Sequence, residues 1–289
     1  MMKTSIYTYT QRPDFLQDCF YWKGRGYHYA GPVPAQVLSP EGWRSDDPWL
    51  ALASILESAK RGDYSHVSHL RQWILDKDCA PTLVSACLGL TADAGLDSDL
   101  EFLAELMLEA PPYLRIEACL AAQWSGVLWL IPFMVEAWRT LPRRADRAAV
   151  EANLTNLLDP VENEPEFFDS GLSDSQYKDA VDARLRELQN AYGSDRCSIS
   201  GGEPIDLNKQ AWLMRKALMP GDTETWIDWS NFLVWRRKFE VYSGVDCSSF
   251  YARNGDFQPL NAAAILDRYL ASPQPFEVGK RYFFGHPLP

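Results

Sequence analysis

The sequence has few of the residue types that form metal and redox sites. Of its 289 residues only four are histidine and six are cysteine, and no two cysteines are spaced as Cys-x-x-Cys. Structural zinc sites are built from four such ligands, so we predict no metal and no cofactor. Cys87 and Cys119 lie in apolar helical runs, where cysteine acts as a small buried side chain. Free cysteines of this kind are typical of a reducing compartment, and we expect a cytoplasmic protein.

Motifs that identify common enzyme classes are also missing. The sequence has no glycine loop for nucleotide phosphates, no Gly-x-Ser-x-Gly elbow and no His-Glu-x-x-His. The best nucleophile candidate is Cys247, with His286 as a distant base. Catalysis requires a thiolate and an imidazole within hydrogen-bond reach, and no local motif brings these two together. A turn capped by Asp246 is the favoured interpretation, and we predict that the protein is not an enzyme.

Long apolar runs and basic residues are scarce as well. The longest apolar run, Val127 to Trp138, contains Pro132 and Glu136 and is shorter than the about 20 residues that span a bilayer, and residues 1–14 lack the apolar core of a signal peptide. The 28 Lys and Arg residues against 39 Asp and Glu residues give a formal net charge of −11. This balance disfavours nucleic acid and anionic membranes as partners and favours a basic protein.

One pattern occurs three times in the first half of the chain. It consists of a proline that opens a helix-forming run, a glycine fourteen residues later, and a second apolar run in the same register, repeated every 31 to 33 residues. Proline fits the first position of a helix, and glycine turns the chain toward the next helix. The three pairs are Pro48 with Gly62, Pro81 with Gly95, and Pro112 with Gly126.

Such repeats indicate helix pairs that stack to form a common core. We therefore predict an all-α fold with HEAT-like helical-pair repeats, an α-solenoid, within a single domain of 289 residues. Residues 1–45 are rich in aromatics and turn formers, and we interpret them as a cap on the first repeat. The repeats occupy residues 46–193, and an irregular helical part with a tail occupies residues 194–289.

Later helices carry two further expectations. The run Val127 to Trp138 is apolar on nearly all sides, which predicts a helix buried on all sides. A long helix is expected from Thr223 to Tyr242, with a basic cluster near its end, where cations interact favourably with the helix dipole. That cluster is formed by Arg236, Arg237 and Lys238.

Two acidic segments are candidates for a partner-binding surface. From Asp78 to Leu114 there are seven acids and no Lys or Arg, and three glutamates recur every four residues beside the apolar stripe of the second helix. An insertion, residues 159–174, holds six acids and an adjacent pair of phenylalanines, which can anchor in a pocket while carboxylates guide a basic surface. The alternatives are a solvated outer face and a loop whose phenylalanines pack on the core. The candidate residues are Glu101, Glu105, Glu109, Glu162, Glu164, Glu166, Phe167, Phe168 and Asp169.

His66 and His69 form the only pair of close histidines. Their i, i+3 spacing on one helix can place two imidazoles on one metal ion, with Asp63 nearby. No further ligand completes a four-ligand site. We therefore interpret both as histidines of the surface or of a groove.

The carboxy-terminal segments resemble those of a known protein class. The series RRKFEVYSGVDCSSFY from Arg236, FQPLNAAAILDRYL from Phe257 and RYFFGHPLP from Arg281 resembles the end of bacterial helical immunity proteins that accompany polymorphic or contact-delivered toxins. This resemblance implies a cytoplasmic protein that binds one cognate toxin domain and blocks its active site or its access to substrate. It implies no catalytic residue.

Three functions are consistent with these observations. The first is an immunity protein that neutralises a toxin, such as a basic nuclease, which an acidic inhibitor would reach by steered association. The second is a scaffold or adaptor of the same shape for another protein. The third is a HEAT-like DNA glycosylase or a cysteine hydrolase, for which a basic groove is required. The four arginines available for such a groove are Arg139, Arg143, Arg144 and Arg147.

The insertion hypothesis leads to a direct prediction. Replacing Glu162, Glu164, Glu166 and Asp169 with serine should leave the thermal midpoint nearly unchanged, because surface substitutions usually change stability by less than about 0.5 kcal/mol. The same change should weaken partner binding and its dependence on salt, measured by calorimetry at several ionic strengths. Unchanged affinity would place the interface elsewhere.

Overall fold

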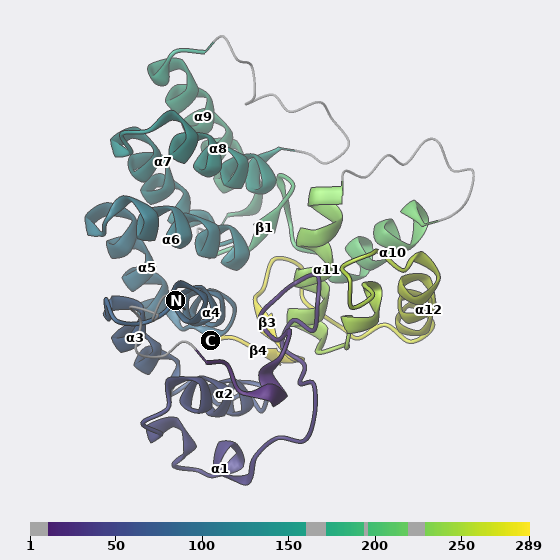
Figure 1. The fold of residues 1–289 in the computed structure, drawn as a ribbon. Coiled ribbons are helices and arrows are strands. Elements are labelled where there is room, and N and C mark those ends of the chain that lie inside the picture. Colours follow the sequence, from purple (N-terminus) through teal and green to yellow (C-terminus); the bar gives the residue numbers. More distant parts are fainter. Residues whose placement is uncertain (1–10, 160–171, 194–195, 219–228) are drawn as a thin grey trace. The chain divides into compact units, whose positions relative to one another are not determined.

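The computed structural model describes residues 11–159, 172–193, 196–218 and 229–289. These residues form twelve α-helices, several short 3₁₀ turns and two antiparallel hairpins (Figure 1). The mostly helical structure confirms the predicted all-α class. In the described ranges, no helix is long and apolar enough to cross a membrane.

The proline and glycine pattern marks the helices as predicted. Each of the three prolines is the first residue of its helix, namely α2 (Pro48–Ala59), α4 (Pro81–Ala94) and α6 (Pro112–Ser125). A second helical segment follows each of them. These segments are η3 (Val67–Leu70) with α3 (Arg71–Leu75), then α5 (Asp97–Glu109), and then η4 (Leu128–Leu130) with α7 (Ile131–Thr140).

The remaining elements flank these helices. Ser173 caps helix α9 (Asp174–Tyr192) with a capping box. Before α2 lie η1 (Asp14–Leu16), α1 (Ala35–Leu38) and η2 (Gly42–Arg44). After α7 follow α8 (Arg144–Leu158), α9 (Asp174–Tyr192), the hairpin β1–β2 (Ile199–Ser200 and Glu203–Pro204), α10 (Leu207–Ala217), α11 (Trp229–Ser243), η6 (Ser248–Phe250), α12 (Pro259–Leu270), and the hairpin β3–β4 (Tyr282–Phe283 and His286–Pro287).

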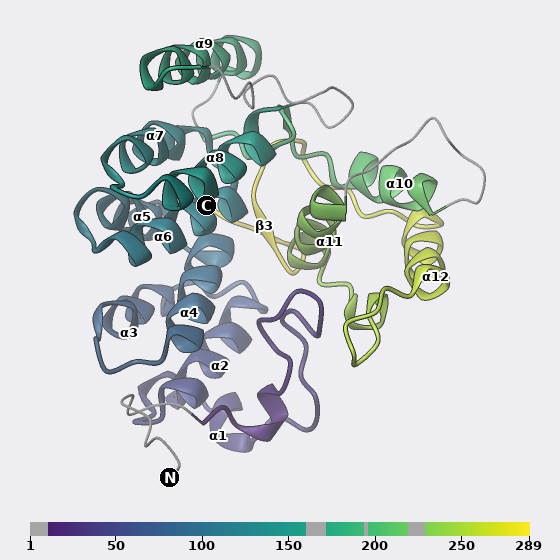
Figure 2. The ribbon, with the colours of Figure 1, turned by 45° about the horizontal axis from the view of Figure 1, so that its top comes forward.

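The chain forms two compact units, each assembled from segments that are distant in sequence. The first unit contains residues 1–99, 239–265 and 282–289, and the second contains residues 100–238 and 266–281. In the first unit, α2 packs against α1 and α4, and β3 packs on α4. In the second unit, α6, α7 and α8 pack on one another and α9 packs on α7 and α8 (Figures 1 and 2). The sequence did not indicate this grouping.

Buried aliphatic side chains confirm the predicted apolar stripe of α5. Leu100, Leu103 and Met107 are 0 % exposed, and Leu106 is 5 % exposed. Full burial of such a side chain stabilises the fold by about 1.5–3 kcal/mol. The inward face of this helix therefore fixes its orientation and leaves the opposite face in solvent.

Two expectations about the later helices are wrong. Helix α7 is buried on one side only, because Pro132, Arg139 and Thr140 face solvent. The basic cluster of α11 is not in the last turn of the helix, which continues to Ser243. All three of its cations are buried, with exposures of 0 % for Arg236, 2 % for Arg237 and 1 % for Lys238.

Trp124 accounts for part of that burial within the second unit. The guanidinium carbon of Arg237 lies 3.6 Å from the centroid of the Trp124 ring, a cation–π contact. The ammonium group of Lys238 donates a hydrogen bond to the backbone carbonyl oxygen of Trp124. The ring and the carbonyl oxygen of Trp124 replace part of the hydration that Arg237 and Lys238 lose on burial. The helix dipole does not stabilise these cations, because its effect is confined to the last turn.

Gly126 ends α6 in a conformation that other residues rarely adopt. Its φ is +72°, and its amide donates to the carbonyl oxygen of Ala122. A Cβ atom at this position would lie 2.5 Å from the oxygen of Ile199 and 2.8 Å from the hydroxyl oxygen of Ser198. Both the torsion and the close approach to β1 therefore require glycine.

We predict that Gly126→Ala destabilises the protein more than Gly193→Ala does. Gly193 has the same left-handed role at the end of α9, with a φ of +67°, but no atom of the described residues lies within 4 Å of its hypothetical Cβ. The torsion alone should cost about 1–2 kcal/mol at either site, and the clash should add about 1–3 kcal/mol at Gly126. Urea unfolding of both variants measures the difference, and equal losses would contradict the close approach to β1.

Candidate functional site

The predicted glutamates of α5 lie on the surface. Glu101, Glu105 and Glu109 are all exposed, and their spacing of four residues places them on one face of the helix. The other predicted residues, Glu162, Glu164, Glu166, Phe167, Phe168 and Asp169, lie outside the described residues.

Exposed apolar side chains accompany this row of glutamates. Leu108 is 37 % exposed and Tyr113, in the first turn of α6, is 61 % exposed. Large exposed side chains of this type are common anchors in protein interfaces. We call the set of Glu101, Glu105, Leu108, Glu109 and Tyr113 the acidic strip.

Charges on the neighbouring helices of the second unit are mostly paired, whereas those of the acidic strip are not. Arg139 pairs with Glu136 at 2.7 Å, Arg143 with Asp146 at 2.7 Å, and Arg184 with Glu187 at 3.1 Å. Within the described part of the chain, no Lys or Arg forms an ion pair with a glutamate of the acidic strip. The strip is therefore a local excess of negative charge.

The arginines considered for the basic groove of a glycosylase are mostly paired with carboxylates as well. Besides Arg139 and Arg143, Arg147 is engaged, in an ion pair with Asp174 at 2.7 Å. Three of the four arginines considered for a groove thus already bind a carboxylate.

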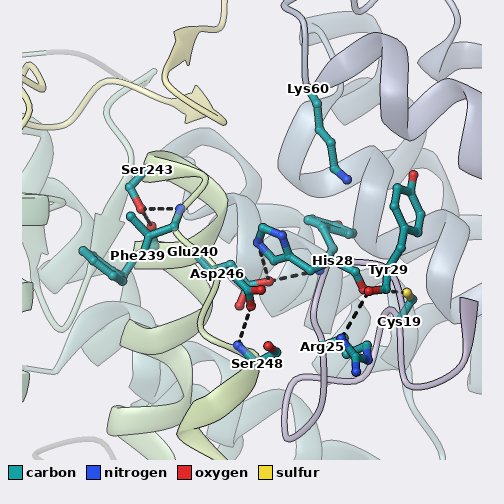
Figure 3. Close-up of polar contacts among 12 residues, drawn as sticks. Cys19, Arg25, His28, Tyr29, Lys60, Phe239, Glu240, Ser243, Asp246 and Ser248 are labelled. Carbon is teal, nitrogen blue, oxygen red and sulfur yellow. Dashed lines mark hydrogen bonds and ion pairs between the residues drawn. The ribbon is translucent and has the colours of Figure 1, made fainter. Parts of the chain in front are cut away.

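A second cluster lies in the first unit around Glu240, which was not predicted from the sequence (Figure 3). The Glu240 side chain is 0 % exposed, and its Oε1 accepts a hydrogen bond from the backbone N–H of Tyr27 at 3.0 Å. The hydroxyl group of Tyr27 donates to Oδ2 of Asp93 at 2.7 Å, also in the interior. Tyr27 therefore connects two buried carboxylates, one through its backbone and one through its side chain.

Gly26 allows the backbone to approach this carboxylate. Its φ is +56°, and a Cβ atom here would lie 1.9 Å from Oε1 of Glu240. Any side chain would displace the carboxylate from the N–H group of Tyr27. The glycine and the glutamate are thus complementary, although the hydrogen-bonded residues are 213 positions apart.

His28 lies near this buried carboxylate and near a carboxylate at the surface. Its Nε2 is 3.8 Å from Oε1 of Glu240, and the surface carboxylate is that of Asp246, drawn with it in Figure 3. Asp246 accepts a hydrogen bond from the backbone N–H of Ser248 at 2.8 Å, which confirms the predicted turn. Burial alone would raise the pKa of Asp246, but the Ser248 hydrogen bonds and the nearby His28 and Arg25 lower it below its ordinary value.

Lys60, the residue that follows α2, lies against the aromatic side chains of the cluster. Its ammonium nitrogen is 4.2 Å from the ring centroid of Tyr29 and 3.0 Å from Oε1 of Glu57. Burial lowers the pKa of Lys60 below its ordinary value, although Glu57 opposes this shift. Burial, followed by the negative charge of Glu57, raises the pKa of Tyr29 well above its ordinary value.

Burial keeps Cys19, Cys79 and Cys87 as thiols rather than thiolates. Cys19 donates to the carbonyl oxygen of His28 at 2.8 Å, and burial raises its pKa to about 12. Burial raises the pKa of Cys79 to about 11 and that of Cys87 well above its ordinary value. Cys247, the nucleophile candidate, is 0 % exposed, so its sulfur is not accessible to a substrate in this structure.

Strained backbone is concentrated at the Glu240 cluster. Among the described residues, three other than glycine have a positive φ, namely Asp18 at 61°, Phe20 at 62° and Phe284 at 49°. Phe20 and Phe284 both contact Tyr27, with ring centroids 5.7 and 6.4 Å apart. Such conformations persist only where the surroundings enforce them, and they are frequent at functional sites.

The histidine pair of the first repeat is explained by packing. His66 stacks on Trp43 with ring centroids 4.6 Å apart, and His69 lies 4.3 Å from the same ring. Among the residues that the structure describes, no group of three or more potential ligands is placed to hold a metal ion. Both histidines are half-buried parts of an aromatic contact at the surface.

Comparison with protein families, curated proteins and solved structures finds no match to this chain. The site must therefore be interpreted from its own geometry.

One signal in the sequence could have identified Glu240. It is an isolated carboxylate between apolar residues, Phe239 before it and Val241 and Tyr242 after it. A charge in such a segment is buried with its neighbours and requires a partner. The sequence does not identify Tyr27 as that partner, because the contact depends on the fold.

We predict that Asp246→Asn lowers stability at neutral pH and has little effect in acid. A carboxylate with a lowered pKa stabilises the folded state above its unfolded pKa of about 3.9, and this stabilisation is lost as pH falls through the folded pKa. The side chain is at the surface, so the loss at neutral pH should be below about 1 kcal/mol.

Urea unfolding at several pH values measures the difference from the wild type. Asp76→Asn is the matched control, because Asp76 also accepts a hydrogen bond from the backbone N–H two residues later, at 2.9 Å. A difference for Asp246→Asn that stayed constant down to about pH 2 would contradict the lowered pKa.

Proposed function

We propose that this protein binds another protein through the acidic strip and catalyses no reaction itself. The observation that carries this proposal is the row of three exposed glutamates on α5 that pair with no base in the described chain, beside exposed Leu108 and Tyr113.

Packing within each unit supports a helical-repeat scaffold of the HEAT-like α-solenoid type. In the first unit the proline-opened helices α2 and α4 pack on each other, and in the second unit α6 packs on α8. Stacking of successive first helices is expected when one helix pair completes the core of the next. Such scaffolds present extended surfaces to their partners.

Electrostatics favours a basic partner. Like charges four residues apart on a helix cost a few tenths of a kcal/mol per pair, and a cationic surface would reverse this cost. The net charge of −11 also attracts such a partner over a distance of about one Debye length, roughly 8 Å in physiological salt. Association should therefore be fast and sensitive to salt.

Tyr113 and Leu108 supply the apolar part of the proposed contact. Interfaces usually depend on a few large side chains surrounded by polar groups that exclude water. Tyr113 follows Pro111 and Pro112, which fix the backbone at the start of α6. An anchor on a rigid turn loses little conformational entropy on binding.

Among protein-binding roles, we infer that of an immunity protein, which neutralises a bacterial toxin by covering its active site. The carboxy-terminal resemblance described above supports this role, and an acidic inhibitor suits a basic toxin such as a nuclease. A scaffold or adaptor would use the same surface, and the two differ in whether the partner is toxic.

We predict that Glu101→Gln, Glu105→Gln and Glu109→Gln together weaken partner binding and reduce its dependence on salt. We expect about a tenfold loss in the association rate at low salt, because steering depends on these charges. Tyr113→Ala should instead speed dissociation, by roughly tenfold to a hundredfold for an anchor residue.

A matched control removes the same charge elsewhere in the second unit. Glu187, Glu203 and Glu277 are exposed residues of other segments, and their change to Gln should leave association much closer to the wild type. Equal losses for both triple variants would show that net charge, rather than the acidic strip, attracts the partner.

Identification of the partner tests the biological role. Affinity capture from the native host, with the wild type and the acidic-strip variant in parallel, should retain one protein on the wild type only. Expression of that protein should arrest growth, and co-expression of the wild type should restore it. A captured partner that does not impair growth would favour an adaptor.

A further inference from the structure

The loop from Asp18 to Tyr29, here called the amino-terminal loop, is held in the first unit by contacts of different chemistry. The backbone N–H of Tyr27 donates to Glu240, and its hydroxyl group donates to Asp93. The thiol of Cys19 donates to the carbonyl oxygen of His28. The fourth contact, between the imidazole of His28 and Glu240, is the one that can gain or lose a charge near neutral pH.

The titratable groups near His28 come from four parts of the fold. Glu240 belongs to α11 and Asp246 to the segment after it, whereas Arg25 and Cys19 belong to the loop itself. Lys60 follows the last residue of α2, and its ammonium group is 5.3 Å from the ring centroid of Phe284, which also contacts His28.

Most of these neighbours keep the same protonation state between about pH 5 and 8. The pKa of Cys19 is about 12, and that of Asp246 is lowered below its ordinary value. Arginine stays protonated in proteins. Lys60 requires a control variant, because burial lowers its pKa below its ordinary alkaline value.

We propose that one proton on His28 fastens the amino-terminal loop to α11, so that the loop is closed at mildly acidic pH and loosens as the pH rises through the histidine titration. The imidazolium ion lies 3.8 Å from a carboxylate that is 0 % exposed. Its deprotonation removes a positive charge from an interior of low dielectric constant, where such attraction is stronger than in water. Opening of the loop hydrates both groups, so the neutral histidine favours the open form.

Backbone strain favours opening once this attraction is lost. Asp18 and Phe20 in the loop both have a positive φ, at 61° and 62°. Each such residue raises the energy of the closed form and is relieved when the loop is released. Solvent can reach the switch, because the His28 side chain is 19 % exposed and Asp246 lies at the surface (Figure 3).

Hydrogen exchange of the full chain tests this proposal. Protection factors for the amides of residues 21–28, corrected for intrinsic exchange, should fall roughly tenfold from about pH 5.5 to about pH 8.5 relative to those of α4, because loss of the charge on His28 favours the open form of the loop. Constant relative protection in the wild type would overturn the proposal without any variant.

Two variants and one control assign the effect. His28→Gln and Glu240→Gln should both abolish the pH dependence, and Glu240→Gln keeps an oxygen that can accept the N–H of Tyr27. Lys60→Gln should retain the fall near neutral pH. A fall that persisted in a folded His28→Gln protein, or that disappeared only in Lys60→Gln, would show that another group controls the loop.

Discussion

The first unit depends on one buried carboxylate. Glu240 is 0 % exposed, and an uncompensated charge in that position would cost several kcal/mol. The backbone N–H of Tyr27 donates a hydrogen bond to this carboxylate, and it can approach only because Gly26 has no side chain. A long-range polar contact, rather than apolar area alone, therefore determines where the amino-terminal loop lies.

Carboxylates have two different roles in this protein. In the first unit, Glu240 and Asp93 are buried and each accepts a hydrogen bond from Tyr27. In the second unit, the glutamates of the acidic strip are exposed and pair with no base in the described ranges. The first arrangement uses charge to specify a conformation. The second leaves charge available for a partner, at the cost of mild repulsion along α5.

Local signals predicted the helices well. The prolines that open α2, α4 and α6 limit their own torsion and need no amide partner, so their effect does not depend on the rest of the fold. Burial of Leu100 and Leu103 followed from helical periodicity in the same way.

Properties that depend on distant contacts were not predictable. One side of α7 is exposed because a helix is covered only where neighbours pack. The Glu240 cluster was missed, since its members come from both ends of the chain. Burial removes charges of both signs from the surface. Arg236, Arg237, Lys238 and Arg281 are buried, but so are five carboxylates of the described residues, namely Asp93, Asp99, Asp146, Asp159 and Glu240. A partner meets the acidic strip at distances below the Debye length of about 8 Å, so the attraction at contact depends on where the exposed glutamates lie and not on the formal charge of −11 alone.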